Sequence, residues 1–139
     1  KEIEAFYDFG EYLAGKSTTI ILDESSNKLK FVYTILNSKL ITFWLRINFN
    51  SLKMSGGFIN LGVNELSQIP IATNENLKHQ LILCADQIII SKKEYSQADT
   101  SDLEKQIDIL VYQLYNLTYD EVLIVDPETP ITREEYEEE

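Results

Sequence analysis

The sequence is poor in the residues that build disulfides, metal sites and active centres. Its 139 residues include one cysteine (Cys84), one histidine (His79), one methionine and one tryptophan. A single cysteine excludes a disulfide framework and favours a reducing compartment, which we take to be the cytoplasm. One histidine and one cysteine do not supply the ligand cluster that zinc requires. We therefore expect no metal site, and we interpret the two residues as a surface histidine and a core thiol.

Signatures of nucleotide-dependent and nucleic-acid-modifying enzymes are also missing. Gly57 and Gly62 have the spacing of a phosphate-binding loop, but Val63 and Asn64 follow where that loop needs Lys and Ser or Thr. No lysine has Asp or Glu two positions before it, and no two prolines are adjacent. These absences exclude the commonest nuclease metal-site signature and the element with which amino-methyltransferases hold a flipped base. We expect a noncatalytic chain that binds no cofactor itself.

The charges are divided unevenly along the chain. There are 12 Lys and Arg against 23 Asp and Glu, for a net charge of -11. Residues 119–139, here called the acidic segment, hold nine carboxylates against Arg133. Residues 25–64, here called the basic segment, contain no Asp or Glu and carry Lys28, Lys30, Lys39, Arg46 and Lys53. Charges more than about 10 Å apart are largely screened in ordinary salt, so the acidic segment does not prevent the basic segment from binding a polyanion.

The residue pattern predicts an α+β fold, with a small mixed β-sheet packed on a long helix and followed by an antiparallel helical hairpin. Aromatic and β-branched runs predict short strands over 2–9, 18–22 and 58–61. An apolar stripe of period 3.6 predicts one helix over 27–47. No apolar run approaches the roughly 20 residues that span a bilayer, so we expect no membrane partner.

Helical patterns dominate the second half of the chain. One turn is predicted over 63–68, ending before Pro70. The hairpin spans 74–117: its first helix is capped at Asn74 or Thr73, and its second carries Leu residues and Ile107 at alternating spacings of four and three. A short helix follows Thr118, and residues 131–139 are predicted to be a solvated tail. The expected division is a recognition half-domain at 1–72, a helical spacer or dimerisation region at 73–126 and a disordered acidic tail at 127–139. Because the chain begins with neither methionine nor a signal peptide, we expect it to be a piece of a larger protein.

The candidate binding residues lie in the basic segment. Lysine, arginine, amide and hydroxyl side chains are the groups that contact phosphates and base edges, and glycines let the backbone approach closely. The candidates are Lys39, Arg46, Asn50, Ser51, Lys53, Ser55, Gly56 and Gly57. The alternative is a solvated helix face followed by an inert connector, with the helix-spaced aromatics in the core. Composition and spacing leave both interpretations open.

Four short motifs resemble a known family. They are LNSKL at 36–40, SGGF at 55–58, LSQIPI at 66–71 and LEKQIDILVYQLYNLT at 103–118. Together they are similar to the TaqI-like C-terminal specificity domain of adenine-specific DNA methyltransferases and of bacterial Type IIG (Type II) restriction-modification enzymes. They are also similar to the recognition halves of Type I specificity subunits. The resemblance covers roughly residues 12–122.

The resemblance implies a domain that reads double-stranded DNA. The parent's N-terminal domains would bind S-adenosylmethionine, flip and methylate the adenine, and in some enzymes cleave DNA as an endonuclease. Residues 48–57 and the cations of the basic segment would face the duplex, and the helices after Asn74 would be a spacer. A second hypothesis is a protein-interaction module in which the 74–117 hairpin pairs with a partner or a second copy through Leu103, Ile107, Leu110 and Leu114. A third, an enzyme using carboxylates such as Asp8 or Glu11, lacks a paired site.

Overall fold

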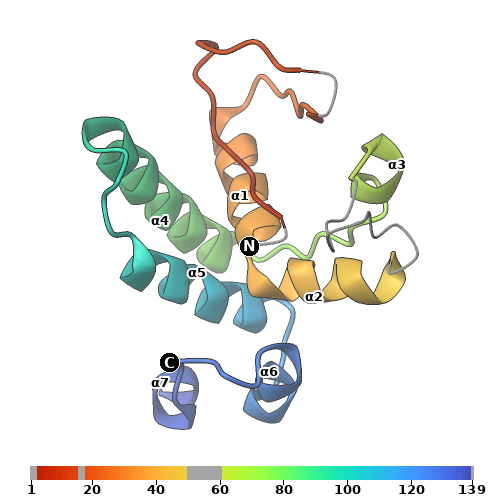
Figure 1. Cartoon of the computed structure of the whole chain (residues 1–139). Coiled ribbons are helices and arrows are strands. Elements are labelled where there is room, and N and C mark those ends of the chain that lie inside the picture. Colours follow the sequence, from red (N-terminus) through yellow and green to blue (C-terminus); the bar gives the residue numbers. More distant parts are fainter. Residues whose placement is uncertain (1–2, 16–17, 50–60, 139) are drawn as a thin grey trace.

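The computed structural model describes residues 3–15, 18–49 and 61–138, and every regular element in these ranges is an α-helix (Figure 1). The helices are α1 (Ser26–Asn37), α2 (Lys39–Asn48), α3 (Val63–Leu66), α4 (Glu75–Glu94), α5 (Ser101–Leu114), α6 (Tyr119–Val125) and α7 (Arg133–Glu137). The described part of the chain is therefore all-helical, and the predicted α+β class is wrong.

The predicted mixed β-sheet is absent from the described residues. Residues 3–8 and 18–22 have no regular secondary structure, and most of the predicted strand at 58–61 lies outside the described ranges. Hydrogen bonds that involve side chains hold the predicted strand regions in place. The Ala5 N–H donates to Asn37 Oδ1 at 3.0 Å, and Thr19 Oγ1 donates to the Leu61 carbonyl at 2.9 Å. A strand is stable only beside another strand that completes its backbone hydrogen bonds. Residues with high β-propensity fit well into a sheet, but they form a strand only if a neighbouring strand is present.

The single helix predicted over 27–47 is two helices that meet at Ser38. Ser38 has φ -74° and ψ 149°, outside the helical region, and it is the N-cap of α2. Its hydroxyl donates to the Ile35 carbonyl at 2.7 Å and accepts the Ile41 N–H at 3.3 Å. Because one non-helical residue hardly disturbs an apolar stripe, the sequence pattern continued through the break.

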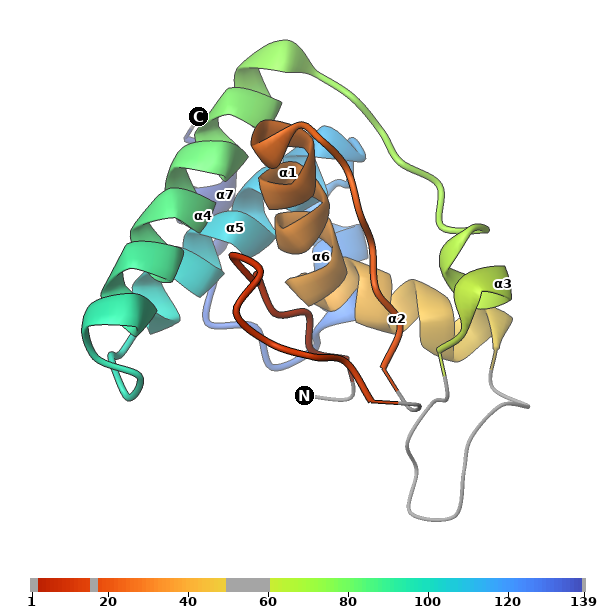
Figure 2. The ribbon, with the colours of Figure 1, turned by 90° about the horizontal axis from the view of Figure 1, so that it is seen from above.

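One hydrophobic core joins the first and second halves of the described chain. Helix α1 packs against α4, and α4 packs against α5, while α2 leads away from α1 toward α3 (Figure 2). The core contains Phe31, Ile35, Ile41, Leu45, Leu81, Ile88, Ile107, Leu110, Val111 and Leu114. The predicted helices on either side of the 95–100 turn are confirmed as α4 and α5, with Asn74 as the first N-cap.

The apolar stripe of α5, through which the second hypothesis pairs the hairpin with a second copy, packs into this core. Ile107, Leu110 and Leu114 are 3%, 1% and 5% exposed, because they pack against the other core helices. A partner could reach these side chains only if α5 left its place. The hairpin is therefore part of this chain's own fold.

The acidic segment is folded over its described residues, although the sequence predicted a disordered tail from residue 127. Helix α6 begins after Thr118, as predicted, and α7 begins after Thr132, each with a reciprocal capping box to a glutamate. Ile131 and Tyr136 are buried with Ile109, Tyr112 and Val122 in a second core cluster. The Tyr136 hydroxyl donates to the Leu117 carbonyl at 2.6 Å. Two buried side chains thus hold a stretch whose charged residues are nearly all acidic.

Candidate nucleic-acid interface

Helix α2 carries two of the predicted DNA-contacting residues on one face. Lys39 is its first residue and Arg46 lies in its last turn. Seven positions are close to two helical turns, so the two residues share a face about 10 Å apart along the axis. Arg46 is exposed, and both residues line the same cleft. The structure brings these two candidates together, whereas Asn50, Ser51, Lys53, Ser55, Gly56 and Gly57 lie outside the described residues.

A buried carboxylate on α5 fixes the start of α2. Asp108 Oδ1 accepts the backbone N–H of Lys39 at 2.9 Å, and the Asp108 residue is only 8% exposed. An anion at a helix N-terminus satisfies an otherwise unpaired N–H and interacts favourably with the helix dipole. The direction in which α2 leaves α1 is therefore set jointly by Ser38 and by a residue on α5.

Sequence reasoning missed Asp108, although the chain offers a signal for it. Asp108 stands alone within the otherwise apolar run from Ile107 to Tyr112. A single carboxylate inside such a run is rarely buried without a partner. The signal indicates that a partner exists, but it does not identify Lys39 as that partner.

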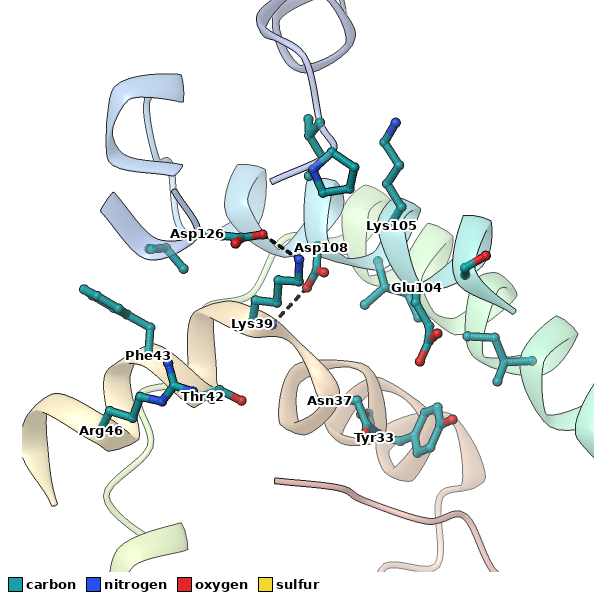
Figure 3. A pocket seen from close by; sticks show the side chains of 16 residues that line it. Tyr33, Asn37, Lys39, Thr42, Phe43, Arg46, Glu104, Lys105, Asp108 and Asp126 are labelled. Carbon is teal, nitrogen blue, oxygen red and sulfur yellow. Dashed lines mark hydrogen bonds and ion pairs between the residues drawn. The ribbon is translucent and has the colours of Figure 1, made fainter. Parts of the chain in front are cut away.

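A cleft of about 450 Å³ opens between α1 and α2 on one side and α5 with the α6–α7 connection on the other (Figure 3). Its charged lining residues are Lys39, Arg46, Lys105, Glu104, Asp108 and Asp126. Phe43, Val125, Pro130 and Ile131 add apolar surface. The cleft is thus the place where the basic and the acidic segments meet.

Lys39 is paired with the acidic segment across this cleft. Its Nζ lies 2.5 Å from Asp126 Oδ2, and Figure 3 shows the lysine side chain directed at that carboxylate. The Lys39 side chain is 48% exposed and the Asp126 side chain 18%. Water and ions therefore reach the lysine more easily than the aspartate. Sequence reasoning did not single out Asp126, because its only apparent role was to end a helix.

Two further cations of the basic segment also have carboxylate neighbours. Lys30 Nζ lies 2.5 Å from Asp86 Oδ1 on α4, and Lys28 Nζ lies 3.8 Å from Asp23 Oδ2. The basic segment has no carboxylate of its own, but folding brings Asp86 and Asp126 to it from distant parts of the chain. Its charge is therefore smaller in the folded protein than the local sequence indicates.

Other polar and aromatic residues of the segment serve the fold. The Asn37 side chain donates to the carbonyls of Ala5 and Tyr33, at 3.1 and 2.9 Å, and holds the N-terminal segment on α1. Trp44 is partly buried against the core, with its ring 5.8 Å from that of Phe49. Burial raises the pKa of Tyr33, and Glu104 and Glu4 raise it further, so this phenol stays neutral beside the cleft. These residues position α1 and α2 and offer little free surface for bases.

The described residues contain no group of three or more His, Cys, Asp and Glu side chains that could hold a metal ion. His79 is exposed, and Cys84 packs against the core, where burial raises the pKa of its thiol. A thiol of that kind is a poor nucleophile. No helix in the described ranges is long and apolar enough to cross a membrane.

Comparison with known proteins identifies the first half of the chain. The family of the TaqI-like C-terminal specificity domain matches residues 1–71. The matched part holds α1, α2 and α3 and all eight predicted DNA-contacting residues, and it ends before α4. No curated protein and no solved structure matches the chain.

Proposed function

The chain belongs to the family of TaqI-like C-terminal specificity domains, which implies DNA target recognition in a restriction-modification enzyme, and we propose that it does this as a noncatalytic module. In this proposal it positions an N-terminal adenine-N6 methyltransferase or endonuclease of the same parent chain on its target, in the cytoplasm. S-adenosylmethionine would bind to that N-terminal part. The observation that carries the proposal is the family match over the whole basic segment.

The proposed contact surface begins on α2. Lys39 and Arg46 face the same side of this helix, and α2 leads directly to residues 50–57, which hold the other six candidates. Arg and Lys bind phosphate oxygens, which fixes the register of a protein on a duplex, while neighbouring polar side chains read base edges. We therefore assign phosphate contacts to Lys39, Arg46 and Lys53. Asn50, Ser51 and Ser55 are the proposed base-reading residues, with Gly56 and Gly57 allowing close approach of the backbone.

Salt dependence of binding to a fluorescent duplex tests this proposal. Each phosphate neutralised by a cation contributes about -0.9 to the slope of log K against log salt concentration. We expect a slope steeper than about -2 for the full chain, with binding weakening between 50 and 200 mM salt. Arg46→Gln should weaken binding and make the slope shallower by about 0.9, because one phosphate contact is lost.

Lys92→Gln is the matched control, because it also removes one positive charge. Lys92 lies in the last turn of α4, at the opposite side of the molecule from α2 in both ribbon views (Figures 1 and 2). The slope of log K against log salt concentration for Lys92→Gln should equal that of the unmodified chain. Equal losses for Arg46→Gln and Lys92→Gln would show that only net charge matters, and they would contradict the assigned surface. No salt-dependent binding to any duplex would contradict the function itself.

A further inference from the structure

The pairing of Lys39 links the candidate DNA surface to the acidic segment. Lys39 Nζ donates to Asp126 Oδ2 at 2.5 Å, across 87 positions of sequence. The lysine lies on α2, at the face assigned above to phosphate contact. A lysine that is paired with a carboxylate must release it, or divide its N–H donors between two anions, before it can hold another anion.

Asp126 is held in place by the fold around it. It is the C-cap of α6, and its N–H donates to the Val122 carbonyl at 2.9 Å. Its carbonyl accepts the Thr129 N–H at 3.1 Å. Val122 is fully buried in the second core cluster. The backbone of Asp126 is thus fixed beside the cleft, and in the free domain its carboxylate lies within reach of Lys39.

A carboxylate and a phosphate diester offer similar chemistry to a lysine. Each is a single negative charge shared by two oxygen acceptors, and an ammonium group binds either as a point charge. The two anions also repel each other when both lie beside the same lysine. One lysine therefore favours one anion at a time.

We propose that Asp126 occupies, in the free domain, the position that a DNA phosphate takes beside Lys39 in the complex, so that the acidic segment competes with DNA. This inference rests on the proposed function. Asp126 then sets how strongly the domain holds any duplex, by placing an anion within the binding face. The acidic segment acts here through one carboxylate at one lysine, and its total charge is secondary.

The Lys30–Asp86 pair provides an internal comparison. Its Nζ–Oδ1 distance is also 2.5 Å, but Lys30 is only 20% exposed and its partner lies on α4. It joins α1 to α4, and neither residue lines the cleft. Neutralising Asp86 changes the net charge as neutralising Asp126 does, without freeing a cation of the proposed DNA surface.

The test compares Asp126→Asn with two charge-matched controls, Asp86→Asn and Glu128→Gln, using the full chain and a random-sequence 20-base-pair duplex. Glu128 is exposed and only two residues from Asp126. We expect Asp126→Asn to bind the duplex about three- to tenfold more tightly, and each control less than about twofold more tightly. The salt slope of Asp126→Asn should be steeper by up to about 0.9, because Lys39 no longer exchanges one anion for another.

Lys39→Gln shows whether the effect passes through the lysine. In a Lys39→Gln background, Asp126→Asn should gain no more affinity than the controls, since no cation is released. The melting temperature of Asp126→Asn should stay within about 3 °C of the unmodified chain, because Lys39 is half-exposed and the asparagine amide oxygen can still accept its hydrogen bond. This separates the binding effect from a loosened fold.

The outcomes distinguish this inference from the proposed function. Salt-dependent binding by the unmodified chain, with Asp126→Asn equal to the controls, would overturn the competition and leave the function standing. Weaker binding by Asp126→Asn would also overturn it, because Asp126 would then be orienting Lys39 for DNA. No binding by the chain or by any variant would overturn both.

Discussion

The basic and acidic segments differ in how their composition relates to their structure. The basic segment holds cations without a single carboxylate, yet Lys30 and Lys39 are paired with Asp86 and Asp126 in the folded chain. The acidic segment looks unstructured by composition, yet it forms α6 and α7 around buried Ile131 and Tyr136. In both segments, the charge of the local sequence is a poor guide to the folded structure. The pairing of each charge depends on which side chains the fold places next to it.

The segments are also held by different chemistry. Helix α2 of the basic segment starts at a buried serine and a buried carboxylate, Ser38 and Asp108. The acidic segment is held by tyrosine hydroxyls: Tyr136 donates to Leu117 and Tyr119 donates to Ile131, at 2.6 and 2.9 Å. Variants that remove one type of anchor should therefore affect one segment more than the other.

The largest effect is expected from removing the aromatic anchor of the acidic segment. Tyr136 is 7% exposed and packs on Tyr112 and Tyr119. Tyr136→Ala should lower the free energy of unfolding by about 3–4 kcal/mol, measured by urea denaturation. Tyr95→Ala, at a residue 65% exposed, is the matched control and should cost less than about 0.5 kcal/mol. Equal, small losses of unfolding free energy in both variants would mean that the acidic segment is disordered, as its composition indicates.

An intermediate effect is expected at the start of α2. Asp108→Ala leaves the partly buried Lys39 N–H without its acceptor and should cost about 2 kcal/mol of unfolding free energy. Asp108→Asn keeps an oxygen acceptor and should recover much of this loss. Amide hydrogen exchange at Lys39 should be faster in the alanine variant than in the asparagine variant. Identical exchange in the two variants would remove Asp108 as the anchor of α2.

The smallest effect is expected at alkaline pH and concerns the tyrosine anchors. Burial raises the pKa of Tyr136 to about 12, with a further contribution from Glu121. Because its pKa in the unfolded chain is about 10, the neutral phenol stabilises the fold fully below pH 10. This stabilisation, on the order of 1 kcal/mol, is lost as the pH rises from about 10 to 12. Urea denaturation at several pH values measures it.

Tyr136→Phe is the control for the alkaline effect. It keeps the ring but cannot ionise, so its stability should fall less steeply between pH 10 and 12. Burial also raises the pKa of Tyr112 and Tyr115, so some alkaline destabilisation should remain in this variant. The same pH dependence in Tyr136→Phe and the unmodified chain would assign the whole effect to the other tyrosines.

Several elements were predictable because their signals are local. Asn74, one of two candidate caps, and Thr118 correctly marked the starts of α4 and α6, and the turn predicted over 63–68 is present as α3, which ends at Leu66. A helix closes its hydrogen bonds within four residues, so its sequence contains most of what forms it. The family was also predicted from short motifs, and the match over residues 1–71 confirms it.

The predictions of a sheet and of a single long helix were wrong for a common reason. A strand depends on a neighbouring strand, which residues 18–22 do not have within the described chain. The break at Ser38 depends partly on Asp108, which accepts the Lys39 N–H from 69 positions further along the chain. Neither partner is visible in a local window of sequence, and a continuous apolar stripe conceals the break.

From the amino-acid order alone came the starts of α4 and α6, the family and the run of positive charge at 25–64, because each depends on neighbours within a few residues. The break between α1 and α2, the burial of the predicted dimer seam and the partner of Lys39 came from the packed fold. Asp126 meets Lys39 across 87 positions. Contacts over such distances are selected by the packing of whole helices, and this packing determines how much of the charge on α2 a DNA phosphate would encounter.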